Sequence, residues 1–272
     1  MNILEKIVAR KHVEVAESKN LRPISSLEKE PFFSRNTVSL SQALRSASFP
    51  KIISEFKRKS PSKGIINDKV LPEVVTREYV RAGAVGLSVL TDIDFFGGSF
   101  DDFLSARKAN PYIPMLRKDF IIDEYQLFEA KSIGADIILL IAACLEPREI
   151  IDLGQKAHKL GLEVLLEVHS AEELAVSLCD SVDIVGVNNR NLKTFETSIE
   201  NSILLSEQIP DSFVKISESG LKDADSLLRL FQYGYKGFLI GETFMKTQNP
   251  GESLAHLQNN LSKFSNSNPL PL

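Results

Sequence analysis

The sequence has no tryptophan and only 2 cysteines and 3 methionines among its 272 residues. Cys144 and Cys179 stand far apart and outside any CxxC spacing, so neither a disulfide framework nor a zinc site is expected. Each cysteine is predicted to be a buried small residue. An excess of basic residues is also missing, because 32 Lys and Arg oppose 36 Asp and Glu, giving a net charge of −4. We therefore expect no nucleic-acid partner, since binding phosphate backbones needs positive charge.

Long apolar segments are also absent. A typical apolar run, residues 137–144, is far shorter than the roughly 20 residues that cross a bilayer. Near the N-terminus, Glu5 and Lys6 stand where a secretory signal would carry apolar residues. The sequence therefore predicts a cytoplasmic protein that has no membrane partner.

Short β-branched runs recur along the middle of the chain, and helical patterns lie between them. The runs are 52–56, 85–90, 113–116, 137–141, 164–168, 184–187, 214–216 and 238–240. The helical patterns include 72–82, 124–132, 146–160, 171–179 and 224–233. Glycines stand just after four of them, at Gly83, Gly134, Gly161 and Gly234, where the helices should end. This alternation predicts parallel strands buried on both faces.

Eight strand-helix units predict a closed (β/α)8 barrel, the TIM-barrel class of α/β fold. The alternative is a doubly wound open sheet, but its nucleotide motifs GxGxxG and GxxxxGK[ST] are missing. The predicted domains are an N-terminal helical extension over 1–47, the barrel over 48–264 and a flexible tail over 265–272. The extension has a second helical signal at 40–44 and is expected to pack near the barrel mouth through an apolar stripe of Ile3, Leu4, Ile7, Val8 and Val13.

Polar side chains follow five of the predicted strands. They are Glu55 and Lys57, Lys118 and Asp119, Glu167, Asn188 and Arg190, and Glu218 and Ser219. Side chains alternate along a strand, so Glu55 and Lys57 share one face, as do Asn188 and Arg190. A single such residue is usually a solvated loop residue, but the strands of a barrel converge at one mouth. Their convergence predicts a common active site.

Two glycine positions indicate a phosphate ligand. Ser219 and Gly220 follow the seventh predicted strand, and Gly241 follows the eighth. Barrels commonly hold a phosphate on backbone amides of these two loops, although glycines there can also serve only as tight turns. Their pairing at adjacent strands favours phosphate.

The motifs around these residues carry a family resemblance. They are Glu55-Phe-Lys57-Arg-Lys-Ser60-Pro-Ser-Lys-Gly64, Ser88-Val-Leu-Thr-Asp92, Phe96-Gly-Gly-Ser99, Leu116-Arg-Lys118-Asp-Phe120, Asn188-Asn-Arg190-Asn-Leu192 and Ser217-Glu-Ser-Gly220. In order and spacing the chain resembles the indole-3-glycerol-phosphate synthase family of tryptophan biosynthesis, from its N-terminal helix to about Pro250. The resemblance implies a lyase that converts 1-(2-carboxyphenylamino)-1-deoxyribulose 5-phosphate to indole-3-glycerol phosphate, releasing carbon dioxide and water without a cofactor or metal.

The resemblance also implies roles for the charged residues. Lys118 is similar to the general acid that protonates the ribulose carbonyl, and Lys57 to a residue that binds substrate or acts as an acid in dehydration. Glu55 and Glu167 resemble carboxylates that orient these lysines and take part in proton removal. Asn188 resembles a residue that fixes the substrate by hydrogen bonding. Arg190 resembles the guanidinium that binds the anthranilate carboxylate, which suits a planar fork.

The remaining site residues are carried over in the same way. Substrate-binding positions are Ser60, Phe96, Phe120, Leu139 and Glu218, of which Phe96, Phe120 and Leu139 would line an apolar slot for the aromatic ring. The phosphate set is Ser219, Gly220, Gly241 and Glu242. Glu242 is expected to offer its amide and to turn its carboxylate away, because a carboxylate repels phosphate. His169 shares the strand face of Glu167, and its role is left open.

Three alternatives remain at this point. The chain could be a phosphoribosylanthranilate isomerase, although neither cysteine stands at a strand end as its acid-base pair would need. It could be a Schiff-base aldolase in which Lys118 or Lys57 is a nucleophile. It could also be a phosphate-binding module without chemistry, which the joint presence of the charged residues argues against. The expected partners are a small sugar-phosphate substrate and, transiently, other enzymes of tryptophan biosynthesis.

Overall fold

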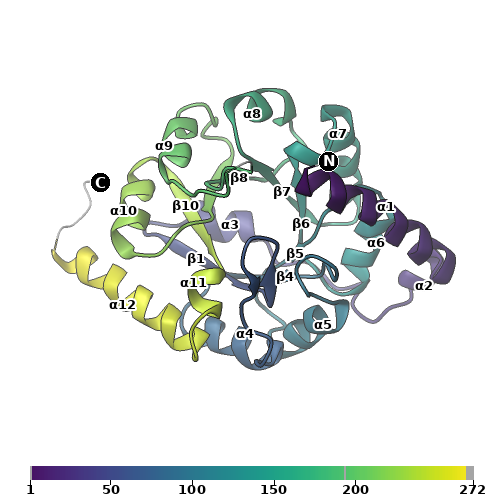
Figure 1. Cartoon of the computed structure of the whole chain (residues 1–272), viewed down its shortest axis with the longest axis horizontal. Coiled ribbons are helices and arrows are strands. Elements are labelled where there is room, and N and C mark those ends of the chain that lie inside the picture. Colours follow the sequence, from purple (N-terminus) through teal and green to yellow (C-terminus); the bar gives the residue numbers. More distant parts are fainter. Residues whose placement is uncertain (1, 193, 268–272) are drawn as a thin grey trace.

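A computed structural model describes residues 2–192 and 194–267 of the chain (Figure 1). Eight parallel strands close into a barrel in the order β1-β10-β9-β8-β7-β6-β5-β4. They are β1 (Lys51–Phe56), β4 (Gly86–Leu90), β5 (Met115–Lys118), β6 (Ile137–Ile141), β7 (Glu163–Val168), β8 (Ile184–Asn188), β9 (Val214–Glu218) and β10 (Tyr235–Ile240). The predicted (β/α)8 barrel is therefore confirmed.

Helices surround the strands, as the ring of ribbons in Figure 1 shows. They are α4 (Pro72–Arg81), α5 (Phe100–Ala109), α6 (Tyr125–Ser132), α7 (Pro147–Lys159), α8 (Ala171–Ser177), α9 (Glu200–Ser206), α10 (Ala224–Gln232), α11 (Glu242–Met245) and α12 (Pro250–Ser267), with a 3-10 turn η1 (Ala142–Cys144). A small hairpin of β2 (Lys59–Ser60) and β3 (Gly64–Ile65) follows β1. Neither this hairpin nor α5, α9, α11 and α12 was among the elements singled out from the sequence.

Strand β6 shows why the strands are apolar throughout. Ile137, Leu139 and Ile141 point into the barrel, whereas Ile138 and Leu140 pack in the cluster between the strands and the helices. Both sets are buried, which is the result of a two-residue repeat in a strand that is covered on both faces. The barrel interior is therefore a packed core, and a site can form only at its ends.

Several predicted boundaries differ from the structure; for example, the strands expected at 214–216 and 238–240 lie at Val214–Glu218 and Tyr235–Ile240. The third strand was expected at 113–116 but lies at Met115–Lys118, because the Ile113 carbonyl accepts a hydrogen bond from Arg107 (3.0 Å) and Pro114 has no N–H to donate. Lys118 therefore belongs to the strand itself. At the other end of the chain, α12 extends to Ser267, three residues into the predicted tail, and residues 268–272 lie outside the described residues.

The N-terminal extension begins with α1 (Ile3–Leu21), which lies beside the barrel mouth. Its buried residues are Ile7, Lys11 and Val15, one helical turn apart, while Ile3 and Leu4 pack partly against the barrel interior. The prediction that Val13 belongs to the buried stripe is wrong, since it is 47% exposed. It stands two residues from Lys11, so the helix turns it toward solvent.

The rest of the extension, α2 (Ile24–Leu27) and α3 (Leu40–Arg45), leads to the opposite end of the barrel. Leu40 and Leu44 of α3 are fully buried in the interior core. Glu163, the first residue of β7, accepts the backbone N–H groups of Leu40 (2.9 Å) and Ser41 (3.1 Å). One segment of chain therefore covers both ends of the barrel.

Candidate active site

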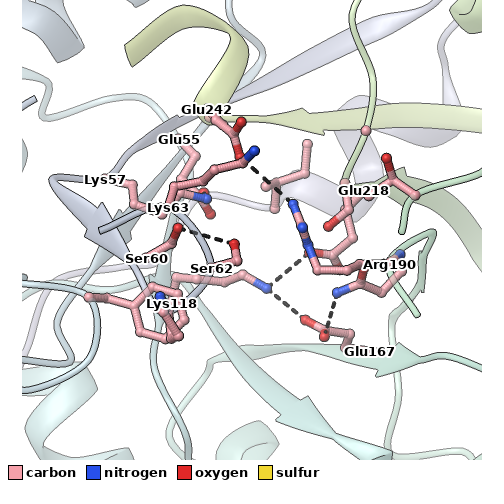
Figure 2. A pocket seen from close by; sticks show the side chains of 18 of the residues that line it. Glu55, Lys57, Ser60, Ser62, Lys63, Lys118, Glu167, Arg190, Glu218 and Glu242 are labelled. Carbon is pink, nitrogen blue, oxygen red and sulfur yellow. Dashed lines mark hydrogen bonds and ion pairs between the residues drawn. The ribbon is translucent and has the colours of Figure 1, made fainter. Parts of the chain in front are cut away.

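A cavity of about 370 Å³ opens at the C-terminal ends of the strands. Residues assigned to the site from the sequence all line it, namely Glu55, Lys57, Ser60, Phe96, Lys118, Phe120, Leu139, Glu167, Asn188, Arg190, Glu218, Ser219, Gly220, Gly241 and Glu242. Figure 2 shows the charged side chains among them pointing into the same space. The closure of the barrel thus brings together residues that are spread over most of the sequence.

Lys118 lies at the centre of an ion cluster. From the end of β5 its Nζ donates to Glu167 Oε2 on β7 (2.7 Å) and to Glu218 Oε2 on β9 (3.0 Å). Burial alone would lower the pKa of Lys118, but the charges of the neighbouring glutamates outweigh burial and hold this pKa above its ordinary value. Lys118 is therefore an ammonium with carboxylates on two sides.

The two carboxylates bound to Lys118 differ in their protonation. Burial tends to raise the pKa of Glu167, but the positive charges of Lys118 and His169 lower it to about 2. Burial and the negative charge of Glu167 together raise the pKa of Glu218 to about 7. Glu167 is thus a permanent carboxylate, whereas Glu218 gains and loses a proton near neutral pH. The sequence placed Glu218 with the substrate-binding residues, but the structure also places it in the ion cluster.

A second lysine–carboxylate pair lies across the cavity. Lys57 Nζ donates to Glu55 Oε1 (2.6 Å), and Ser88 Oγ donates to the other oxygen of Glu55 (3.3 Å). Gly241, at the end of β10, is required here because a Cβ atom at this position would lie 2.5 Å from Glu55 Oε1. The backbone of the last barrel loop therefore runs directly beside this ion pair.

Asn188 and Arg190 continue the wall of the cavity from β8. Asn188 Nδ2 donates to Glu167 Oε1 (2.9 Å), and its Oδ1 accepts the backbone N–H of Arg190 (2.9 Å). The Arg190 guanidinium donates to the Phe195 carbonyl (3.1 Å) and lies 3.7 Å from Glu242 Oε2. Glu242 was expected to turn its carboxylate away from the phosphate, and in the structure this carboxylate faces Arg190, whose guanidinium attracts it.

An apolar wall lies opposite the charged groups. The rings of Phe96 and Phe120 are tilted against each other with centroids 6.0 Å apart, and Leu139 lies on the same cavity. From the N-terminal helix, Ile3, Leu4 and Ile7 line the cavity as well. The extension therefore contributes to the apolar side of the site.

Lys11 on α1 was missed in the sequence, where it has the pattern of an ordinary surface lysine. It is only 3% exposed, and its Nζ lies 3.0 Å from Asp92 Oδ2 and 2.9 Å from Asp119 Oδ1. Asp92 accepts the backbone N–H of Phe96 (3.1 Å), and Asp119 accepts that of Phe120 (2.8 Å). One buried ammonium therefore anchors both loops that carry the aromatic rings. Its position one helical turn after Ile7 was the available signal.

The turn after β9 has an unusual backbone. Ser219 and Gly220 both have left-handed conformations, with φ of 69° and 74°. A Cβ atom on Gly220 would lie 2.7 Å from the Cβ of Thr197, so glycine is needed for space as well as for conformation. Strained backbone of this kind is common where a ligand is held. The predicted phosphate site at this turn and Gly241 stays a prediction.

The two cysteines form no disulfide with each other. Both cysteines are free and half-buried rather than fully buried, and burial together with nearby glutamates raises the pKa of Cys144 to about 12. Within residues 2–192 and 194–267, no group of His, Cys, Asp and Glu is placed to hold a metal ion. Over the same residues, no helix combines the length and apolarity needed to span a membrane.

The fold and the site together define a (β/α)8-barrel enzyme with charged lysines beside an apolar slot. The protein-family model described as indole-3-glycerol phosphate synthase matches residues 4–257 of the chain. The chain is 49% identical over 256 residues to the indole-3-glycerol phosphate synthase of Bacteroides thetaiotaomicron, covering 93% of this chain and 96% of that protein. It is 42% identical to that of Laribacter hongkongensis over 260 residues, covering 94% and 98%. The chain belongs to the indole-3-glycerol phosphate synthase family.

Solved structures support the fold alone. The barrel is similar to 3-hexulose-6-phosphate synthase from Salmonella typhimurium, with a TM-score of 0.61 and 11% identity over 78% of this chain and 99% of that one. It is also similar to the tryptophan synthase alpha subunit from Legionella pneumophila, with a TM-score of 0.54 and 14% identity over 84% and 95%. At these identities the likeness carries no information about the reaction.

Proposed function

We propose that this chain converts 1-(2-carboxyphenylamino)-1-deoxyribulose 5-phosphate to indole-3-glycerol phosphate, and that the cluster around Lys118 carries the ring closure. The observation that carries the proposal is the ammonium of Lys118, held between Glu167 and Glu218 beside the apolar slot. The slot would hold the anthranilate ring and direct the ribulose carbonyl toward this ammonium. Family membership supports the same reaction.

In the first step, the ring carbon that bears the carboxylate bonds to the ribulose carbonyl carbon. The carbonyl oxygen gains negative charge as this bond forms, and Lys118 donates a proton to it. A Schiff base would instead require a neutral amine as nucleophile. The glutamates around Lys118 favour its charged form, so they support acid catalysis over imine formation.

The next steps release carbon dioxide and water. Loss of the carboxylate as carbon dioxide restores the aromatic ring, and Arg190 would orient this carboxylate until it leaves. The hydroxyl formed in the first step then departs as water with a proton, for which Lys57 is the proposed donor. Glu167 is the proposed base for the proton lost from the substrate, with Glu55 holding Lys57 in place at 2.6 Å. Asn188 would keep Glu167 oriented through its 2.9 Å hydrogen bond.

The phosphate end of the substrate would lie at the turn of Ser219 and Gly220 and at the start of α11. The backbone amides of Gly220, Gly241 and Glu242 are the proposed donors, with Ser60 of the β2–β3 hairpin above them. The carboxylate of Glu242, drawn toward Arg190, leaves its own amide available for this contact. Backbone amides suit a dianion because they supply dipoles without mobile side chains.

We also propose a cytoplasmic location, which the composition and charge support, and transient contact with other enzymes of tryptophan biosynthesis, which the family resemblance implies. The isomerase alternative finds no support, because Cys144 does not line the cavity and its pKa of about 12 keeps the thiol neutral.

The test is turnover by the purified protein. Because the chain has no tryptophan, the indole product should give a fluorescence rise over a nearly dark background when the carboxyphenylamino substrate is added. Release of carbon dioxide in equal amount would identify the decarboxylation. Product formed from phosphoribosylanthranilate, or none from either substrate, would overturn the proposal.

A further inference from the structure

His169 is a largely buried residue that lies between carboxylates, and the mechanism above does not use it. It follows β7 directly and lines the catalytic cavity, with a side chain that is 9% exposed. Its Nε2 lies 3.4 Å from Glu167 Oε1, and its Nδ1 lies 3.3 Å from Glu173 Oε2. Among the described residues, Nε2 has no hydrogen-bond partner. A polar atom thus points at the proposed base without being satisfied elsewhere.

The two ring nitrogens face different carboxylates on different elements. Glu173, on α8, also accepts the backbone N–H of His169 at 2.7 Å, so the ring is anchored on this side. Glu167 accepts a hydrogen bond from Lys118 at Oε2 and one from Asn188 at Oε1, and the imidazole also lies near Oε1. A small rotation of the ring would turn the 3.4 Å approach into a hydrogen bond.

The acidic groups near the ring favour its charged form. Burial lowers the pKa of His169, but its hydrogen bond to Glu173 and the charges of Glu167, Glu173 and Glu218 raise this pKa above the ordinary value. Lys118 lies on the far side of Glu167, and the Cys144 thiol, on η1, stays neutral. An imidazolium can donate from both nitrogens, which this arrangement of two carboxylates requires.

We propose that His169 is a positioning residue whose imidazolium, anchored by Glu173, holds the Glu167 carboxylate in the orientation that proton removal needs. The proposal rests on the proposed role of Glu167 as base. His169 itself needs no contact with the substrate, because it acts through Glu167 Oε1. A similar pairing occurs in metal sites, where a carboxylate bound to one ring nitrogen of a histidine fixes the orientation of the ring.

The proposal has a definite pH signature. The positive charge beside Glu167 is present below the pKa of His169 and is lost as the pH rises through it. Turnover should therefore fall on the alkaline side, at a pH set by this histidine. Glu173→Gln keeps a hydrogen-bond acceptor but removes a charge that raises the pKa of His169, so it should move the alkaline fall in kcat to lower pH.

The kinetic experiment compares kcat and KM from pH 5 to 10 in wild type, Glu173→Gln and His169→Gln. His169→Gln should lower kcat about tenfold, the low end of the loss seen when a residue that orients a functional group is removed, with KM nearly unchanged and no histidine-dependent fall. His158→Gln is the matched control, because exposed His158 pairs with Asp183 (2.8 Å) away from the cavity. The control should follow the wild-type profile. A profile of His169→Gln that also follows wild type would overturn the proposal.

A second measurement needs no activity. The chain has 4 histidines, so their ring signals can be followed by NMR in wild type and assigned with His169→Gln. The ring of His169 should stay protonated to higher pH than a free imidazole and should titrate earlier in Glu173→Gln. A ring that is neutral at neutral pH would overturn the inference even if the enzyme is active. Wild type that titrates as expected but forms no indole product would instead overturn the proposed function.

Discussion

Replacing Lys118 by methionine removes the ammonium between Glu167 and Glu218 and keeps most of the length of the side chain. The proton donor for ring closure is lost, and loss of a positioned acid costs about 100-fold or more in turnover. That factor corresponds to about 2.7 kcal/mol of transition-state stabilisation. Substrate binding should remain measurable, since the apolar slot, Arg190 and the phosphate loops are untouched. We therefore expect kcat to fall at least about 100-fold with a much smaller change in KM.

The same substitution changes the charge balance of the carboxylates. Lys118 is a main reason that the pKa of Glu167 is about 2, so in its absence the two buried glutamates repel and one should hold a proton at neutral pH. Lys118→Arg separates charge from proton donation, because a guanidinium keeps the charge but does not give up a proton. It should therefore restore the ionised pair without restoring turnover. Lys108→Met, at an exposed position of α5, is the matched control for the loss of one charge.

The assay is the rise of indole fluorescence, with calorimetric titration of the substrate for binding. Borohydride added during turnover should trap no adduct, because an ammonium forms no imine. A stable mass increase on Lys118 after reduction would refute acid catalysis by this residue. Near-normal turnover of Lys118→Met would refute the residue assignment itself.

Three further outcomes follow from the site. A crystal soaked in sulfate should show an anion at the amides of Gly220 and Gly241 with Lys57 in reach, and an anion only at the opposite barrel end would contradict this. Lys11→Met removes the ammonium shared by two buried carboxylates, so it should lower the free energy of unfolding in urea by about 3 kcal/mol and raise KM; an unchanged KM in the folded variant would exclude a role at the mouth. Glu218, with its pKa of about 7, destabilises the native state as pH rises above the unfolded value of about 4.3. Glu218→Gln should therefore gain more in Tm at pH 8 than at pH 5, and an equal gain would refute this.

Much of the fold could be predicted because its causes are local. An unbroken run of apolar side chains, as in Ile137–Ile141, indicates burial on both faces of a strand without knowledge of any partner. Polar residues at strand ends can be assigned to one mouth once parallel strands are assumed, and Glu55, Lys118 and Glu167 do line one cavity. The displaced start of β5 shows the limit, since a proline and a carbonyl bound by Arg107 decide it.

The pairing of charges could not be predicted, because it depends on how the barrel closes. Lys11 is buried only since Asp92 and Asp119, from the ends of two strands, meet beside it. The turning of Glu242 toward Arg190 likewise depends on β8 and β10 lying on either side of β9 in the closed barrel. Glu218 owes its pKa of about 7 to burial beside Glu167, a neighbour 51 positions away (218 − 167). Sequence patterns do not report contacts between residues that lie this far apart in the chain.

The extension that covers both ends of the barrel has a consequence for the order of folding. Its anchors are distant in the chain, since the Val38 amide binds Asp136, 98 residues later, and Ser39 binds Glu163, 124 residues later. Contacts of such sequence separation form slowly, because a long loop must close first. During synthesis this segment leaves the ribosome before any of these anchors exists. The part of the chain made first should therefore be among the last to become ordered, and its apolar residues would remain accessible to chaperones until most of the barrel has been translated.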